Sequence, residues 1–127
     1  MQNLNGKRVV ITGGSLGLGL AMVESLASCG ANVSAIGRDR VKLSAAEQAG
    51  AAVVAGDATD ATLMTSVIRK EMPDVLILNA RARLPMKPID QQTWDELSTT
   101  WNTDVKAGLV GIQAALNTPM KPGGAFW

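Results

Sequence analysis

A glycine-rich turn between an apolar run and a helical pattern constrains the fold of this chain more than any other feature. The turn covers residues 12–19, reads Thr-Gly-Gly-Ser-Leu-Gly-Leu-Gly and follows Val9-Val10-Ile11. Gly13 can adopt backbone angles closed to other residues, Gly17 lets the main chain approach a pyrophosphate, and Gly19 lets the new helix pack against the sheet. The helix N-terminus offers N–H groups and a partial positive charge to an anion. The pattern predicts a dinucleotide phosphate site; the alternative is an ordinary strand-to-helix turn.

Strand-like and helix-like patterns alternate along the rest of the chain. Apolar runs typical of parallel strands cover residues 7–12, 32–36, 51–55 and 74–80. Four helical patterns lie between and after these runs. The first ends at Cys29-Gly30, the second fits residues 40–49, and the third runs from Asp60 to Pro73. The fourth runs from the Thr93 and Glu96 capping box to about Asn117. Right-handed crossovers then predict an α/β fold, a Rossmann-like doubly wound parallel sheet in the order 3-2-1-4. Ala125-Phe126-Trp127 remain as only a stub of a fifth strand.

The last helical pattern carries an apolar stripe that we interpret as a packing face rather than a cofactor box. Its members are Trp94, Leu97, Trp101, Val105, Gly108 and Ile112. Asn102 lies beside Trp101 and Val105, which we expect to be buried. An unpaired buried amide costs about 1–3 kcal/mol, so we expect Asn102 to have a hydrogen-bond partner.

Length and composition restrict the classes of function. A chain of 127 residues forms one domain, but a complete doubly wound dehydrogenase needs roughly 200 residues or more. The net charge of +1 and the scattered Lys and Arg residues indicate no nucleic-acid partner. Cys29 has no second cysteine to pair with, no leader or membrane-length apolar run is present, and the chain has no His. We therefore expect a cytoplasmic protein with neither a membrane anchor nor a metal site.

The glycine pattern at residues 12–19, with Gly6-Lys7 ahead of it, resembles the short-chain dehydrogenase/reductase family. Asp57 resembles the family's aspartate after the third strand, which accepts a hydrogen bond from the adenine amino group. Asn79-Ala80 resembles the family's Asn-Ala-Gly segment. Asn102 resembles the helix asparagine of its catalytic tetrad, which bonds main chain and helps to hold a water in a proton relay.

The resemblance implies cofactor contacts from the glycine loop, the end of the second strand and the turns after the third and fourth strands. These residues are Gly13, Ser15, Leu16, Gly17, Leu18, Gly19, Arg38, Asp57, Ala58, Asn79 and Ala80. Two of them have simpler interpretations. Asp57 could be a turn residue, and the Asn79 side chain at a strand end could hydrogen-bond local backbone groups.

Residues 37 and 38 favour NADP over NAD. An NAD site places Asp or Glu at the end of the second strand to bind the ribose hydroxyls, whereas this chain has Gly37 and then Arg38. Gly37 leaves room for a 2′-phosphate, and the planar guanidinium of Arg38 can hold it. The alternative is that Arg38 is one solvated charge of the Arg38-Asp39-Arg40 turn.

The sequence departs from the family at two points. Family catalysis uses a serine after the fifth strand and a Tyr-x-x-x-Lys on the next helix, but this chain has no Tyr and ends before that serine. Arg81 stands where the family has a glycine near the cofactor, although a cation there also suits a phosphate. Pro85, Met86 and Pro88 would form one wall of a substrate pocket for a small carbonyl or alcohol.

Three functions remain open. The first is the truncated cofactor-binding half of an NADP-dependent short-chain oxidoreductase, inactive alone. The second is a non-catalytic nucleotide-binding or interaction module, in which an open apolar strand edge recruits a second copy and gives a homo-oligomer. The third is a regulatory protein that responds to the NADP/NADPH ratio.

Overall fold

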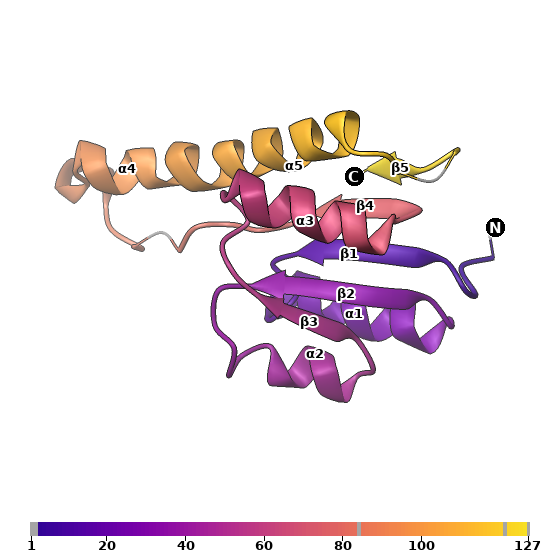
Figure 1. Ribbon diagram of the computed structural model, residues 1–127. Helices are drawn as coiled ribbons and strands as arrows, with labels where there is room; N and C mark the ends of the chain where they lie inside the picture. Colours follow the sequence, from indigo (N-terminus) through magenta and orange to yellow (C-terminus); the bar gives the residue numbers. More distant parts are fainter. Residues whose placement is uncertain (1–2, 84, 121, 127) are drawn as a thin grey trace.

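A five-stranded parallel sheet in the order β3-β2-β1-β4-β5 forms the centre of the computed structural model (Figure 1), which describes residues 3–83, 85–120 and 122–126. The strands are β1 Arg8–Thr12, β2 Asn32–Gly37, β3 Ala52–Ala55, β4 Val75–Leu78 and β5 Ala125–Phe126. In the centre of the sheet, Ile11 of β1 pairs with Ala35 of β2 and with Ile77 of β4. The predicted Rossmann-like α/β fold and its strand order are confirmed. The stub of a fifth strand pairs through Ala125 and Phe126 with β4, and Trp127 lies outside the described residues.

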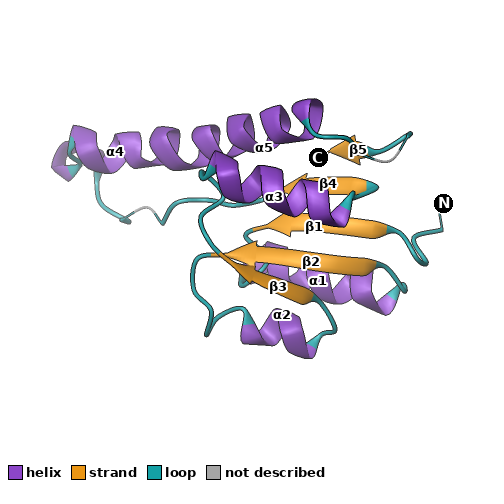
Figure 2. Ribbon diagram, in the orientation of Figure 1, coloured by secondary structure: helices purple, strands orange, loops and turns teal. Residues whose placement is uncertain are grey.

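Helices cover both faces of the sheet (Figure 2). They are α1 Gly17–Ser28, α2 Ser44–Gln48, α3 Ala61–Glu71, the short 3-10 helix η1 Ile89–Gln91, α4 Trp94–Thr100, the π-helical segment η2 Trp101–Val105 and α5 Lys106–Asn117. The described part of the chain has no helix that is long and apolar enough to span a membrane.

Each face of the sheet has its own hydrophobic core because neighbouring strand residues point in opposite directions. Ile11 of β1 packs with Val23 of α1 and with Leu43 on one face. On the other face, Val10 packs with Met64 and other residues of α3 and α5. The apolar run of β1 is therefore buried on both faces, as expected for a parallel strand, whereas in β4 Leu76 is buried and the other three residues are half-buried.

The predicted helix starts agree with the structure at two helices and differ at a third. The Asp60 carboxylate accepts hydrogen bonds from the N–H groups of Thr62 and Leu63 at the start of α3. The capping box of Thr93 and Glu96 opens α4. Helix α2 begins at Ser44 rather than at residue 40, because the Asp39 carboxylate accepts from the N–H groups of the following residues and forms a separate turn.

The predicted packing stripe of the last helix is wrong for its first four residues, whereas Gly108 and Ile112 are half-buried. Trp94 and Trp101 are 75% and 70% exposed, and Leu97 and Val105 are also exposed. The buried face consists instead of Ala107, Val110, Gly111, Ala114 and Ala115. Two features explain the difference. Helix α4 projects beyond the carboxyl edge of the sheet (Figure 1), and the wider turn of η2 shifts the phase of the helix before α5 reaches β4.

Candidate functional site

The candidate site lies at the carboxyl edge of the sheet, where the chain leaves β1 and β4. The strand order reverses between these two neighbours, and open α/β sheets bind ligands at such a switch point. The buried Thr12 ties the two strand ends together, because its hydroxyl oxygen accepts hydrogen bonds from Asn79 N and Ala80 N at 3.0 and 3.1 Å. Thr12 was not among the predicted site residues. A hydroxyl at a strand end, just before the glycine turn, is the sequence signal that marks it.

Gly13 and Gly19 allow the loop after β1 to pack closely against its neighbours. Gly13 has a φ of +71°, and a Cβ atom there would lie 2.9 Å from the Cα of Ala80. A Cβ atom on Gly19 would collide with the carbonyl oxygen of Gly13. Both positions therefore require glycine, in agreement with the close helix packing inferred for Gly19.

Gly17 has the other property that a phosphate loop needs. Its φ is +55°, and a Cβ atom built on it meets no described atom within 4 Å. Gly17 opens α1, and no side chain caps this helix from the preceding residue, Leu16. Leu16 and Leu18 are both exposed. The backbone at the start of α1 therefore faces open space, as anion binding by N–H groups demands.

Gly37 brings the end of β2 close to the glycine loop. A Cβ atom on Gly37 would lie 3.4 Å from the Ser15 hydroxyl oxygen and 3.1 Å from a methyl group of Leu43. The next residue, Arg38, is exposed and forms no ion pair with a carboxylate of the described residues. Asp39 does not neutralise it, because the Asp39 carboxylate faces its own turn and Lys42 at 3.9 Å.

Asp57 is an exposed carboxylate whose pKa is lowered from its ordinary value of 3.8. The main cause is the hydrogen bond from Thr59 N–H. The Thr59 hydroxyl and the positive charges of Arg38 and Lys106 lower the pKa further. The turn that we weighed as an alternative is thus present, and both bonds fall on Oδ1, which leaves Oδ2 without a bond from the described residues. Lys106, in the first turn of α5, was missed by the sequence analysis.

Ala58 and Asn79 take part in the packing of the site. The Ala58 side chain is buried in the core beside α3, so only its backbone is available to a ligand. The Asn79 amide donates from Nδ2 to the carbonyl oxygen of Gly13 at 3.2 Å. Asn79 therefore holds the glycine loop, and its acceptor is a backbone group 66 positions away rather than the local backbone weighed as the alternative. Direct cofactor contacts by Ala58, Asn79 and Ala80 stay predictions.

Asn102 and Asp104 both lie on η2, but only Asp104 contacts the segment after β4. The Asn102 side chain is exposed and makes no hydrogen bond with the described residues, so the expected partner beside buried neighbours is not found. The half-buried Asp104 accepts a hydrogen bond from Ala82 N at Oδ1. The catalytic role of Asn102 stays a prediction. Arg81, next to Ala82, is exposed.

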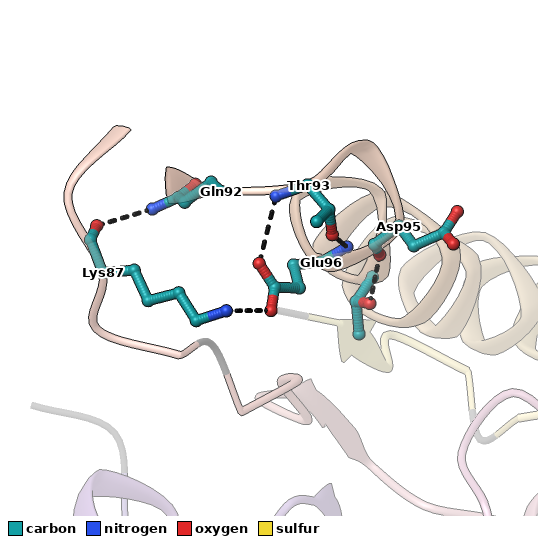
Figure 3. Close-up of polar contacts among 6 residues, drawn as sticks. Lys87, Gln92, Thr93, Asp95 and Glu96 are labelled. Atoms are coloured by element: carbon teal, nitrogen blue, oxygen red, sulfur yellow. Dashed lines mark hydrogen bonds and ion pairs between the residues drawn. The ribbon is translucent and has the colours of Figure 1, made fainter. Parts of the chain in front are cut away.

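A polar network joins the loop after residue 84 to the start of α4 (Figure 3). Lys87 forms an ion pair with Glu96, and Gln92 donates a hydrogen bond to the Lys87 carbonyl oxygen at 3.0 Å. The Lys87 ammonium is the main cause that lowers the pKa of the Glu96 carboxyl. A hollow of about 480 Å³ lies here, and its lining residues are Pro85, Met86, Lys87, Pro88, Gln92, Glu96 and Leu97. The three residues expected to form a pocket wall thus line one hollow.

Comparison with known proteins extends the resemblance over nearly the whole chain. A family model described as short chain dehydrogenase matches residues 7–125. Among curated relatives, the oxidoreductase asL5 of Sarocladium schorii is 31% identical, covering 98% of this chain and 53% of that protein. Gluconate 5-dehydrogenase of Gluconobacter oxydans (strain 621H) is 32% identical, covering 77% of this chain and 43% of that protein. The chain thus spans about half the length of the curated relatives it matches.

Solved structures show the same partial coverage. A blue fluorescent protein from a metagenomic library, in complex with NADPH, superposes with a TM-score of 0.77 at 31% identity, covering 98% of this chain and 56% of that chain. A mutant short-chain dehydrogenase/reductase of Serratia marcescens superposes with a TM-score of 0.77 at 27% identity, covering 98% of this chain and 55% of that chain.

Proposed function

The chain belongs to the short-chain dehydrogenase family, and from this premise we propose that it is the NADP-binding half of a carbonyl or alcohol oxidoreductase. The observation that carries the proposal is Gly17, whose positive φ and open surroundings leave the start of α1 free for a pyrophosphate. The two ends of β1 and β4, tied by Thr12, would form the floor of the crevice.

The choice of NADP rests on the charges around the end of β2. The Ser15 hydroxyl beside Gly37 is a donor for a 2′-phosphate, and Arg38 is an exposed cation without an ion-pair partner among the described residues. Lys106 adds a second positive charge close enough to act on Asp57. A carboxylate near two cations still suits adenine, because its free Oδ2 can accept a hydrogen bond from an amino group.

The nicotinamide group, when bound, supplies or takes the hydride. This chain's own residues bind and orient the dinucleotide, but the sequence has no tyrosine to serve as the family's general acid. We therefore expect the 127 residues to bind NADPH without reducing ketones or aldehydes. NADPH oxidation above a protein-free control, across a panel of carbonyl compounds, would contradict this part of the proposal.

A matched pair of glycine variants tests the nucleotide site. Gly50 shares two properties with Gly17, a positive φ of +99° and open space around a built Cβ atom, but it lies between α2 and β3. Gly17→Val and Gly50→Val should therefore suffer similar backbone strain. We expect only Gly17→Val to abolish NADPH binding in calorimetric titrations, with circular dichroism confirming that both variants fold. Normal binding by Gly17→Val would reduce the glycine loop to a turn.

A second candidate function, a non-catalytic interaction module, is favoured by the exposed apolar side chains of α4 and η2. Trp94, Leu97, Trp101 and Val105 lie on one continuous helical rod. Such a surface suits a second copy of the chain. In this alternative, self-association would persist in Gly17→Val, while nucleotide binding would be absent from the parent chain.

A further inference from the structure

The segment from Asn79 to Ala82 forms the wall of the crevice beside the glycine loop, and it is held at both ends. Its first two N–H groups bond to Thr12, and the Asn79 side chain bonds to Gly13. At its far end, Ala82 N–H bonds to the Asp104 carboxylate. We propose that Asp104 is a positioning residue for the dinucleotide, acting through this segment.

Asp104 joins η2 to the segment that follows β4. This contact joins residues 22 positions apart, and in it a half-buried carboxylate of η2 meets the loop after β4. Hydrogen bonds to an ionised acceptor are stronger than neutral ones. In contrast, the side chains of Ser98 and Thr99 on α4 bond only to a carbonyl group of their own helix. Asp104 thus links the helix to the crevice wall by a hydrogen bond.

Asn102 and Asp104 lie two positions apart on the π-helical segment and differ in burial. An α-helix places residues 102 and 104 about 200° apart around its axis, so they face different directions. In η2 the exposed residue is Asn102 and the half-buried one is Asp104. Short π-helical turns within α-helices occur often at functional sites.

Fixing the wall matters for a bound nucleotide, and this step rests on the proposed dinucleotide site. A Cβ atom on Gly13 would lie 3.0 Å from both the nitrogen of Ala80 and the carbonyl oxygen of Asn79, so the wall and the glycine loop are in direct contact. If the wall occupies its binding position only one tenth of the time, the apparent affinity falls tenfold. Asp104 therefore prevents a loss of affinity by holding the crevice wall in its binding position, without touching the nucleotide.

Three variants of the full chain separate this role from a general effect on stability. Asp104→Ala removes the acceptor, Asp104→Asn keeps an oxygen acceptor for Ala82 N–H, and Asp95→Ala removes an exposed carboxylate from α4. Amide hydrogen exchange at Ala82 directly reports on the hydrogen bond from Ala82 N–H to Asp104. Calorimetric titration with NADPH and NADH measures the affinity, and thermal unfolding checks that each variant is folded.

We expect Asp104→Ala to speed exchange at Ala82 and to weaken both nucleotides about tenfold, and Asp104→Asn and Asp95→Ala to stay within threefold of the parent chain. Equal affinities of the parent and Asp104→Ala, or no rescue by Asp104→Asn, would overturn the inference alone. A parent chain that binds neither nucleotide would overturn the proposed function, and the positioning role with it. Unchanged amide exchange at Ala82 in Asp104→Ala would overturn the inference that Asp104 holds this segment, whatever the affinities show.

Discussion

Arg38 differs from its neighbour Asp39 in having no ion-pair partner among the described residues. Asp39 is engaged with its own turn and with Lys42, whereas Arg38 stands next to Gly37 and acts on Asp57 only through its charge. An always-charged planar group without a partner is suited to a phosphate. At the scale of single residues, this position decides the nucleotide preference that we propose.

Arg38→Ala should remove the preference for NADPH over NADH. A hydrogen-bonded ion pair contributes about 1.5–3 kcal/mol, so we expect NADPH binding to weaken by about tenfold or more. NADH binding should stay nearly unchanged, because NADH has no 2′-phosphate. Fluorescence titration with both nucleotides measures the change, and Arg40→Ala in the same turn is the control. Equal weakening of both nucleotides would refute the assigned role.

Asp57 gives a prediction on pH. Its pKa is lowered in the folded chain, chiefly by the hydrogen bond from Thr59 N–H. A lowered pKa means that the stabilisation by this carboxylate is complete above the unfolded value, near 3.8, and is lost as the pH falls through the folded value. We expect Asp57→Asn to be less stable than the parent at pH 7 and the gap to narrow below about pH 4. Urea unfolding at several pH values measures the difference in stability between the two chains. A difference that stays constant with pH would contradict the prediction.

Sequence patterns located the glycine loop correctly because its chemistry is local. Gly13 and Gly17 adopt a positive φ, which glycine allows without steric cost. Thr12, Asp104 and Lys106 were missed because their contacts depend on distant strands and helices. The 22 positions between Ala82 and Asp104 include a helix start and a π-helical turn, and neither propensity nor spacing predicts their combined geometry.

At the scale of elements, the start of α4 is fixed by a reciprocal pair of hydrogen bonds. Thr93 accepts from Glu96 N–H at Oγ1, and Glu96 accepts from Thr93 N–H at Oε2 (Figure 3). The signal for this start was readable from two residues three positions apart. Which side of the helix faces the sheet could not be read from the sequence, because a strict 3.6-residue period cannot represent the wider turn at η2.

Thr93→Ala should destabilise the chain by about 1 kcal/mol, the usual loss when a helix N-cap is removed. Thr99→Ala is the matched control, since it makes the same chemical change within α4, where alanine is the better helix former. Thermal and urea unfolding compare the two variants. A Thr93→Ala chain as stable as the control would show that α4 does not depend on its cap.

At the scale of the whole molecule, helices pack on both faces of the sheet, but the rod formed by α4, η2 and α5 has an exposed apolar side. The apolar side chains exposed on it are Trp94, Leu97, Trp101, Val105, Leu109 and Leu116. Meanwhile β5 pairs with only two residues of β4. Exposed apolar patches of this kind mark sites of association.

We expect the chain to self-associate through this rod. Trp94→Lys combined with Trp101→Lys should shift the chain toward a monomer, because two charges disfavour burial of the patch. Val41→Lys is the control, because Val41 is 80% exposed but lies outside the rod. Light scattering across a dilution series distinguishes the outcomes. A parent chain that stays monomeric at high concentration would contradict the expectation.

The parallel pairing of β1 with β4 also has a consequence for synthesis of the protein. Arg8 and Asp74, which bond to each other across these strands, are 66 positions apart. A ribosome adds about 5–20 residues per second, so roughly 3 to 13 seconds pass before β4 follows β1 out. During that time β2 and β3 can pair on one side of β1 while its other edge has no neighbour. The innermost strand of the sheet is thus the first to be made and must wait for its second neighbour.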